Sequence, residues 1–150
     1  FDQVKVEAFK PALLAAMEQR LREVDAIANR KDAPTFDKIA GDLRKFMAGS
    51  VLVAQNAEFD VAFLNAEFGR AGMAKLAMPA LDTILLARKV KPGLPTYNLD
   101  NLAYHFKVKF KERHRSIGDC EVTGVIFWQC VEALRPKTMD DLFKKGMIKQ

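Results

Sequence analysis

The stretch "VLVAQNAEFDVAFLNAEF", residues 51–68, joins a short apolar run to a polar turn and then to a segment with helical spacing. Residues 51–54 are too few for a helix and include two valines, so they predict a buried strand. From Phe59 to Phe68, large apolar residues recur one helical turn apart, which predicts a helix that stops near Gly72. This order of strand, turn and helix indicates that the chain mixes strands with helices.

Asp60 follows Phe59 in the first turn of that predicted helix. A carboxylate at this place lies at the edge where open α/β sheets bind their ligands, so Asp60 is well placed for a metal ion. The alternative is that Asp60 only favours the positive end of the helix dipole.

A second polar stretch, "ERHRSIGDCEVTG", covers residues 112–124. Four residues separate His114 from Asp119, so a loop histidine and an early helical carboxylate can reach one cleft. Histidine accepts a proton near neutral pH, and carboxylates bind Mg²⁺ or Mn²⁺, which together suit metal-assisted phosphodiester hydrolysis. Taken singly, His114 also fits a surface residue of a basic loop, and Asp119 a first-turn helix carboxylate.

Periodicity along the rest of the chain predicts mostly helices. They are expected over residues 7–30, 36–46, 82–90, 99–106 (with Asn98 as its cap) and 116–135. Asp82 is expected to cap or to favour the start of its helix. Val108 to Phe110 is the one further segment that predicts a strand. We divide the chain into an N-terminal amphipathic helix (1–31), an α/β domain (32–135) and a polar C-terminal tail (136–150) that holds at most one short amphipathic turn.

Composition sets broad limits on the class of protein. The 150 residues are 49% apolar, enough for one domain with a core, and the net charge of +5 permits a polyanionic partner as readily as a solvated basic surface. The sequence has no run of about 18 apolar residues and no signal peptide, which predicts a cytoplasmic protein with no membrane contact. Cys120 and Cys130 are expected to be buried free thiols, because no zinc-ligand spacing is present.

Three segments together resemble a known family. "VLVAQNAEFDVAFLNAEF", "PALDTILLARKVKPGLPTYNLDNLAYHF" and "HRSIGDCEVTGVIF" are similar to the second and third motifs, and the region between them, of DEDD-type 3'-5' exonucleases of the histidine subclass. The family includes the proofreading epsilon subunit of bacterial DNA polymerase III, and the resemblance runs over residues 32–134.

This resemblance implies a ribonuclease H-like α/β fold and two divalent ions, Mg²⁺ or Mn²⁺, that cut the terminal phosphodiester of a nucleic acid, with single-stranded 3' ends as substrate and a replicative polymerase as partner. It implies Asp60 and Asp119 as metal ligands and His114 as the general base. It also places Asn56 and Phe59 at the elbow that grips the substrate strand.

The chain departs from the family at its N-terminal side. The first motif of the family, Asp-x-Glu, supplies two further metal ligands and is not found, and Gln55 stands where the family usually has histidine. Residues 1–36 instead resemble the N-terminal helices of thimet-oligopeptidase-like zinc metallopeptidases, without their His-Glu-x-x-His motif. We therefore expect a truncated, helix-dominated fold with a remnant sheet, and little or no exonuclease activity.

Two other functions stay open. One is a non-catalytic nucleic-acid-binding module, because basic side chains alternate with Val108 and Phe110: Lys107, Lys109, Lys111, Arg113 and Arg115. A solvated edge strand explains that pattern equally well. The other is a helical protein-interaction module, including an oligomer in which the N-terminal helix packs on the α/β domain.

Overall fold

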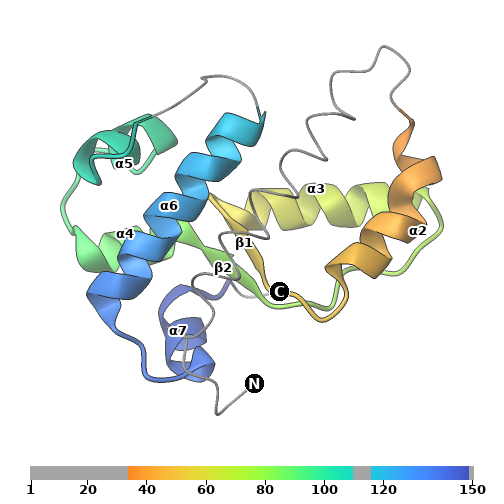
Figure 1. Ribbon diagram of the computed structural model, residues 1–150. Coiled ribbons are helices and arrows are strands. Elements are labelled where there is room, and N and C mark those ends of the chain that lie inside the picture. The colour runs from red at the N-terminus through yellow and green to blue at the C-terminus, as the bar shows by residue number, and fades with distance from the viewer. Residues whose placement is uncertain (1–33, 110–115, 149–150) are drawn as a thin grey trace.

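The computed structural model describes residues 34–109 and 116–148 (Figure 1). The helix predicted over 7–30, and with it the segment 1–31, lies outside the described residues. No helix in the described part is both long and apolar enough to cross a membrane.

Helices dominate the described residues, and the sheet has only two strands, as the sequence predicted. In chain order the elements are α2 (Phe36–Met47), β1 (Leu52–Ala54), α3 (Ala57–Arg70), β2 (Ala80–Asp82), α4 (Thr83–Val90), α5 (Leu99–His105), α6 (Ser116–Leu134) and α7 (Met139–Gly146).

The two strands are parallel, and the last residue of β1, Ala54, pairs with the last residue of β2, Asp82. Both strands therefore end at the same edge of the sheet, and each leads into a helix. The expectation that residues 108–110 supply the second strand was wrong for the described residues 108 and 109. The N–H of Val108 donates instead to the carbonyl of Ala103 and closes the end of α5, where Lys107 is left-handed (φ 56°).

The main core lies between the sheet and the last four helices. Its fully buried side chains include Leu81, Leu86, Leu102, Ile126 and Leu142. Helix α4 packs against both α6 and α7, so the C-terminal segment closes one side of this core.

The C-terminal segment is more than the polar tail that the sequence suggested. Thr138 caps α7 by accepting from the N–H of Asp141, and Leu142 is buried in the core. After α7, Met147 forms an antiparallel bridge with Leu81, and the N–H of Ile148 donates to the carbonyl of Ala80 (3.0 Å). The end of the chain thus covers the outer edge of β2.

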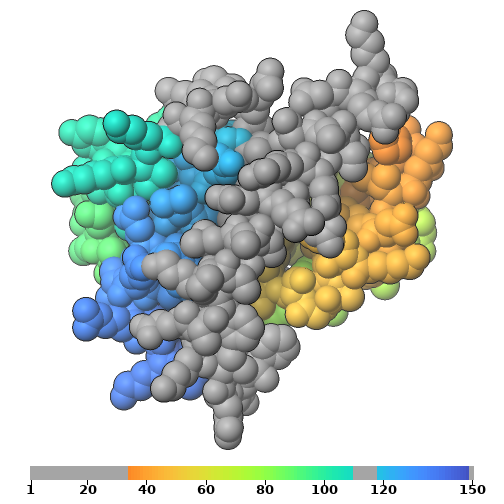
Figure 2. Space-filling model, viewed as in Figure 1, coloured from red at the N-terminus to blue at the C-terminus, as the bar shows by residue number. Residues whose placement is uncertain are grey.

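A smaller core holds α2 against the far end of α3. The rings of Phe36 and Phe68 meet edge to face with centroids 5.2 Å apart, and Ala40 and Leu76 are buried beside them. Figures 1 and 2 show α2 on the opposite side of the molecule from α4 and α5. Helix α3 spans the distance, so its first turn lies at the sheet and its last turn at α2.

Candidate functional site

The turn between β1 and α3 determines where the predicted site lies. Asn56 adopts a left-handed conformation (φ 63°, ψ 50°), which asparagine tolerates better than most residues, and α3 begins at the next residue. This sharp turn places Asp60 in the first turn of α3, beside the end of β1.

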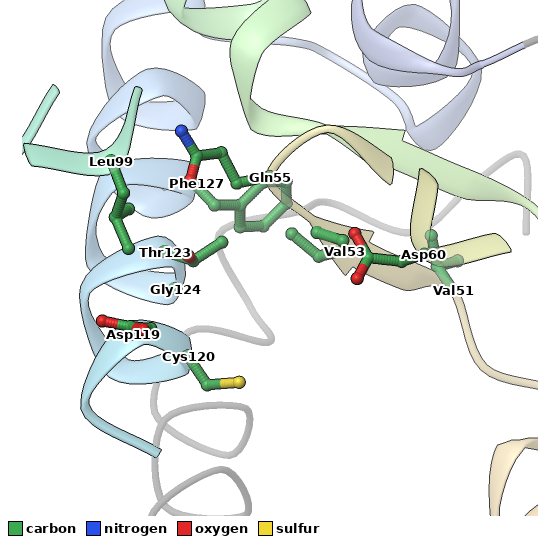
Figure 3. Close-up of a pocket in the computed structure, with 11 residues that line it drawn as sticks. Val51, Val53, Gln55, Asp60, Leu99, Asp119, Cys120, Thr123, Gly124 and Phe127 are labelled. Atoms are coloured by element: carbon green, nitrogen blue, oxygen red, sulfur yellow. The ribbon is translucent and has the colours of Figure 1, made fainter. Parts of the chain in front are cut away.

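A cavity of about 560 Å³ opens between β1, the start of α3 and one face of α6 (Figure 3). Its lining residues are Val51, Val53, Ala54, Gln55, Asp60, Leu99, Asp119, Cys120, Thr123, Gly124 and Phe127. Asp60 and Asp119, which 58 intervening residues separate, therefore line the same cavity.

Figure 3 shows the Asp60 carboxylate and the Cys120 thiol directed toward the space between α3 and α6. Asp119 lies on the side of Cys120 away from Asp60 in this view, and its carboxylate does not point toward the Asp60 carboxylate. The expectation that Cys120 is buried was wrong, because this residue is exposed, whereas Cys130 is buried as predicted.

The cavity is electrostatically suited to a cation. Burial raises the pKa of the Asp60 carboxyl above its ordinary value, and the negative charge of Asp82 adds to the rise. Crowding by protein atoms also raises the pKa of the Cys120 thiol, and the charges of Asp119 and Asp60 raise it further. Both shifts disfavour further negative charge in the cavity, and a bound cation would relieve them.

The structure describes some of the other predicted site residues and not others. Asn56 and Phe59 lie at the start of α3 with both side chains exposed. Lys107 and Lys109 are exposed and are not part of the cavity lining. His114, Arg113 and Arg115 lie outside the described residues.

The sequence did not predict the other cavity-lining residues of α6, among them Thr123 and Phe127. Asp119, Thr123 and Phe127 follow one another at steps of four, so helical spacing after Asp119 was the signal that would have found them. Gln55 was noted only as a departure from the family. Its Nε2 donates to the carbonyl of Tyr97 (2.8 Å), which joins the cavity rim to the loop between α4 and α5.

Strand β2 leads directly into helix α4, and Asp82 is the N-cap residue of this helix. One oxygen of Asp82, Oδ1, accepts from the N–H of Ile84 (2.7 Å), which confirms the predicted cap of α4. Asp82 is buried with 7% of its surface exposed, so it faces the protein and not the cavity.

Comparison with known proteins identifies the family of this α/β domain. The sequence matches the RNase_T exonuclease family over residues 3–127. The chain belongs to this exonuclease family. The match begins at residue 3, so it also takes in most of the segment 1–31 that we separated on the sequence, and the ribonuclease H-like fold class that we predicted is confirmed.

Named relatives agree with this assignment. The chain is 36% identical to a DNA polymerase III PolC-type protein of Oceanobacillus iheyensis over 110 residues, which are 73% of this chain and 8% of that protein. It is 39% identical to DNA polymerase III subunit epsilon of Treponema pallidum, covering 69% of this chain and 47% of the relative. It is 32% identical to the 3'-5' exonuclease DinG of Bacillus subtilis, covering 77% and 13%.

The chain thus spans less than half the length of these relatives. No solved structure gave a significant match. The domain is homologous to the exonuclease domains of DNA polymerase III epsilon and PolC proteins.

Proposed function

We propose that the cavity between α3 and α6 binds a divalent cation, Mg²⁺ or Mn²⁺, through Asp60 and Asp119 and receives the 3' end of a single-stranded nucleic acid. The observation that carries this proposal is that these two carboxylates, far apart in the sequence, line one cavity at the carboxyl edge of the parallel sheet.

The donor set fits such a cation in part. Carboxylate oxygens are the ligands that Mg²⁺ prefers, and the pKa of Asp60 is raised by burial and by the nearby charge of Asp82, which a cation would offset. Among the described residues, however, no three His, Cys, Asp or Glu side chains are grouped so as to hold a metal ion. Mg²⁺ demands near-octahedral coordination and keeps its waters, so two carboxylates hold it loosely.

Each residue has a separate task in this proposal. Asp60 and Asp119 would bind the cation, and His114, the general base that the family resemblance implies, would accept the proton of an attacking water. Phe59, exposed in the first turn of α3, would stack on a base of the strand, and Asn56 forms the turn before this helix. A bound divalent ion would supply charge neutralisation at the reacting phosphate and a more acidic water.

The same observations predict that this chain alone has little or no exonuclease activity. Hydrolysis of this type depends on two ions at fixed positions about 3.5 to 4 Å apart, which two carboxylates do not define. The relatives named as DNA polymerase III proteins support a replicative polymerase as the partner in proofreading.

Calorimetric titration with Mn²⁺ tests the cation site directly. Asp60→Asn and Asp119→Asn should each weaken Mn²⁺ binding at least about 10-fold. Glu121→Gln is the matched control, because it removes the same charge from α6 at a residue that does not line the cavity. Equal affinities for all four proteins would refute the site.

Release of mononucleotides from a 3'-labelled oligonucleotide with Mn²⁺ tests the activity. We expect the unmodified chain to release little or none above the level of Asp119→Ala and His114→Ala. Robust release that both substitutions abolish would show a complete catalytic site and would refute the predicted inactivity.

A second candidate is a non-catalytic nucleic-acid-binding module. It is favoured by two exposed aromatic rings one turn apart on α3, Phe59 (67% exposed) and Phe63 (57%), and by the exposed Lys107 and Lys109. Affinity for single-stranded oligonucleotides should then fall steeply between about 50 and 200 mM salt, since phosphate contacts release counterions. Affinity that does not change with salt would exclude a phosphate-binding surface.

A further inference from the structure

Two polar side chains are buried among the described residues, and they are neighbours in the sequence: Asp82 (7% exposed) and Thr83 (1%). Burying a polar group is costly unless it is hydrogen-bonded, so the partners of these two residues show what the burial achieves. Both residues stand where β2 passes into α4, directly beside the end of β1.

The side chains of Asp82 and Thr83 both form hydrogen bonds to the backbone at the end of β1 and in the turn that follows it. Asp82 Oδ1 accepts from the backbone N–H of Asn56 (3.2 Å), in addition to the N–H of Ile84. Thr83 Oγ1 donates to the backbone carbonyl of Ala54 (3.4 Å). The two bonds therefore bracket Gln55, whose own side chain is bound to the carbonyl of Tyr97.

The turn at Asn56 depends on hydrogen bonds from residues outside it. Asn56 is left-handed, a conformation that costs most residues with a side chain roughly 1 to 2 kcal/mol relative to the right-handed form and costs asparagine less. Its side chain makes no capping bond to α3. The conformation of Asn56 is thus stabilised by the neighbouring strand, through the register that pairs Ala54 with Asp82.

We propose that Asp82 and Thr83 form an elbow clamp, a pair of positioning residues that fixes the left-handed turn at Asn56 and so directs Asp60 into the cavity. Asp60 lies one helical turn beyond Asn56, so a change of backbone conformation at Asn56 re-aims the first turn of α3 and its carboxylate with it. The functional part of this inference, that the aimed group is a cation ligand, rests on the proposed function.

The competing explanation is that Asp82 serves only as the N-cap of α4. The two roles use the same oxygen but different N–H groups, Asn56 for the clamp and Ile84 for the cap. Amide hydrogen exchange measured by NMR on the full chain separates them.

The decisive pair is Asp82→Asn against Asp82→Leu. Asparagine keeps an oxygen acceptor at the same place, whereas leucine has a similar shape and no acceptor. We expect the Asn56 amide to exchange at least about 10-fold faster in Asp82→Leu than in Asp82→Asn, with the Cα shift of Asn56 moving away from its left-handed value. Faster exchange at Ile84 with Asn56 unchanged would overturn the clamp.

A second pair decides the question if Asp82→Leu does not fold. Thr83→Ser keeps the hydroxyl that binds Ala54, and Thr83→Val removes it at nearly constant volume. The clamp predicts that the Asn56 shift is native in the serine variant and altered in the valine variant. The same shift in both variants would overturn it.

Mn²⁺ affinity links the clamp to the site. Asp82→Leu should weaken binding about 10- to 100-fold, as loss of an outer-shell support usually does, and Asp82→Asn should weaken it by much less. Absence of Mn²⁺ binding by the unmodified chain would refute the proposed function, while the exchange measurements would still decide the clamp. Equal affinities for the two variants would refute the link from Asn56 to Asp60.

Discussion

The two strand-to-helix turns of the sheet differ in how each uses its carboxylate. At the end of β2, Asp82 is buried and accepts two backbone N–H groups through one oxygen. In the first turn of the helix that follows β1, Asp60 is half-buried, faces a cavity and has a raised pKa. Asp82 is the last residue of β2 and pairs with Ala54, whereas Asp60 lies in the first turn of the helix that follows β1, so the two carboxylates differ both in position and in surroundings.

This difference in surroundings distinguishes a carboxylate that stabilises the fold from one that is typical of a binding or catalytic site. A buried carboxylate that accepts backbone hydrogen bonds contributes to the stability of the fold. A carboxylate whose ionised form is disfavoured in a cavity lowers that stability and is typical of binding and catalytic sites. Replacing each group should therefore have opposite effects on folding.

The largest effect is expected at Asp82. Asp82→Leu should lower the free energy of unfolding by roughly 2 to 3 kcal/mol, because two backbone N–H groups lose a charged acceptor inside the protein. Asp60→Leu should change it by less than about 1 kcal/mol. Urea unfolding followed by circular dichroism measures both, and similar losses for the two variants would remove the distinction between the turns.

The helices that follow the two strands, α3 after β1 and α4 after β2, also differ in how closely other atoms approach them at a glycine. A Cβ added at Gly146, in α7, would lie 2.6 Å from Leu86 Cδ2 and 2.7 Å from Leu86 Cγ, so α7 meets α4 at a glycine. Gly146→Ala should destabilise the fold by about 1 to 2 kcal/mol, since Leu86 is fully buried and has little room to move.

The matched control for this substitution is Gly69→Ala in α3. A Cβ at Gly69 would meet no atom within 4 Å, and alanine favours a helix over glycine by up to about 1 kcal/mol. Thermal unfolding should therefore show a lower Tm for Gly146→Ala and an equal or higher Tm for Gly69→Ala. A lower Tm for both would mean that the close approach to Leu86 is not the cause.

The sequence predicted the helices of this fold better than its sheet. Phe36 to Phe46 and Leu99 to Phe106 carry a clear apolar periodicity, and α2 and α5 lie there. Strand β2 was missed because Ala80, Leu81 and Asp82 are all buried, which leaves no alternation to read, and because three residues before a helix are easily read as part of it. Tertiary packing decided this element.

For the candidate site, the sequence predicted two carboxylates that line one cavity in the structure, but not their surroundings. Their role as metal ligands stays a prediction. The family resemblance implied that Asp60 and Asp119 belong to one metal site, and both line the cavity. That Cys120 lines the same cavity, and that Asp82 is bound to the turn at Asn56, depend on contacts between distant segments. Local patterns carry no record of such contacts.

The smallest effect is expected at Asp60, where substitution should stabilise the protein. Because burial raises the pKa of this carboxyl, the folded chain binds the proton more tightly than the unfolded chain. The ionised group therefore costs no stability below its unfolded pKa, near 4, and costs progressively more as the pH rises through the folded pKa. Asp60→Asn removes this cost, so its advantage over the unmodified protein should grow between about pH 3 and pH 7.

The gain at neutral pH should stay under about 1 kcal/mol, because solvent screens a half-exposed carboxylate. Glu58→Gln is the control, since it removes the same charge from the same first turn at an exposed position, where a negative charge favours the helix dipole. That variant should be slightly less stable than the unmodified protein at pH 7. Urea unfolding midpoints at pH 3 and pH 7 test this prediction. If the difference in midpoint between Asp60→Asn and the unmodified protein is the same at both pH values, ionisation of Asp60 does not cost stability. The contrast with Asp82 would then rest on hydrogen bonding alone.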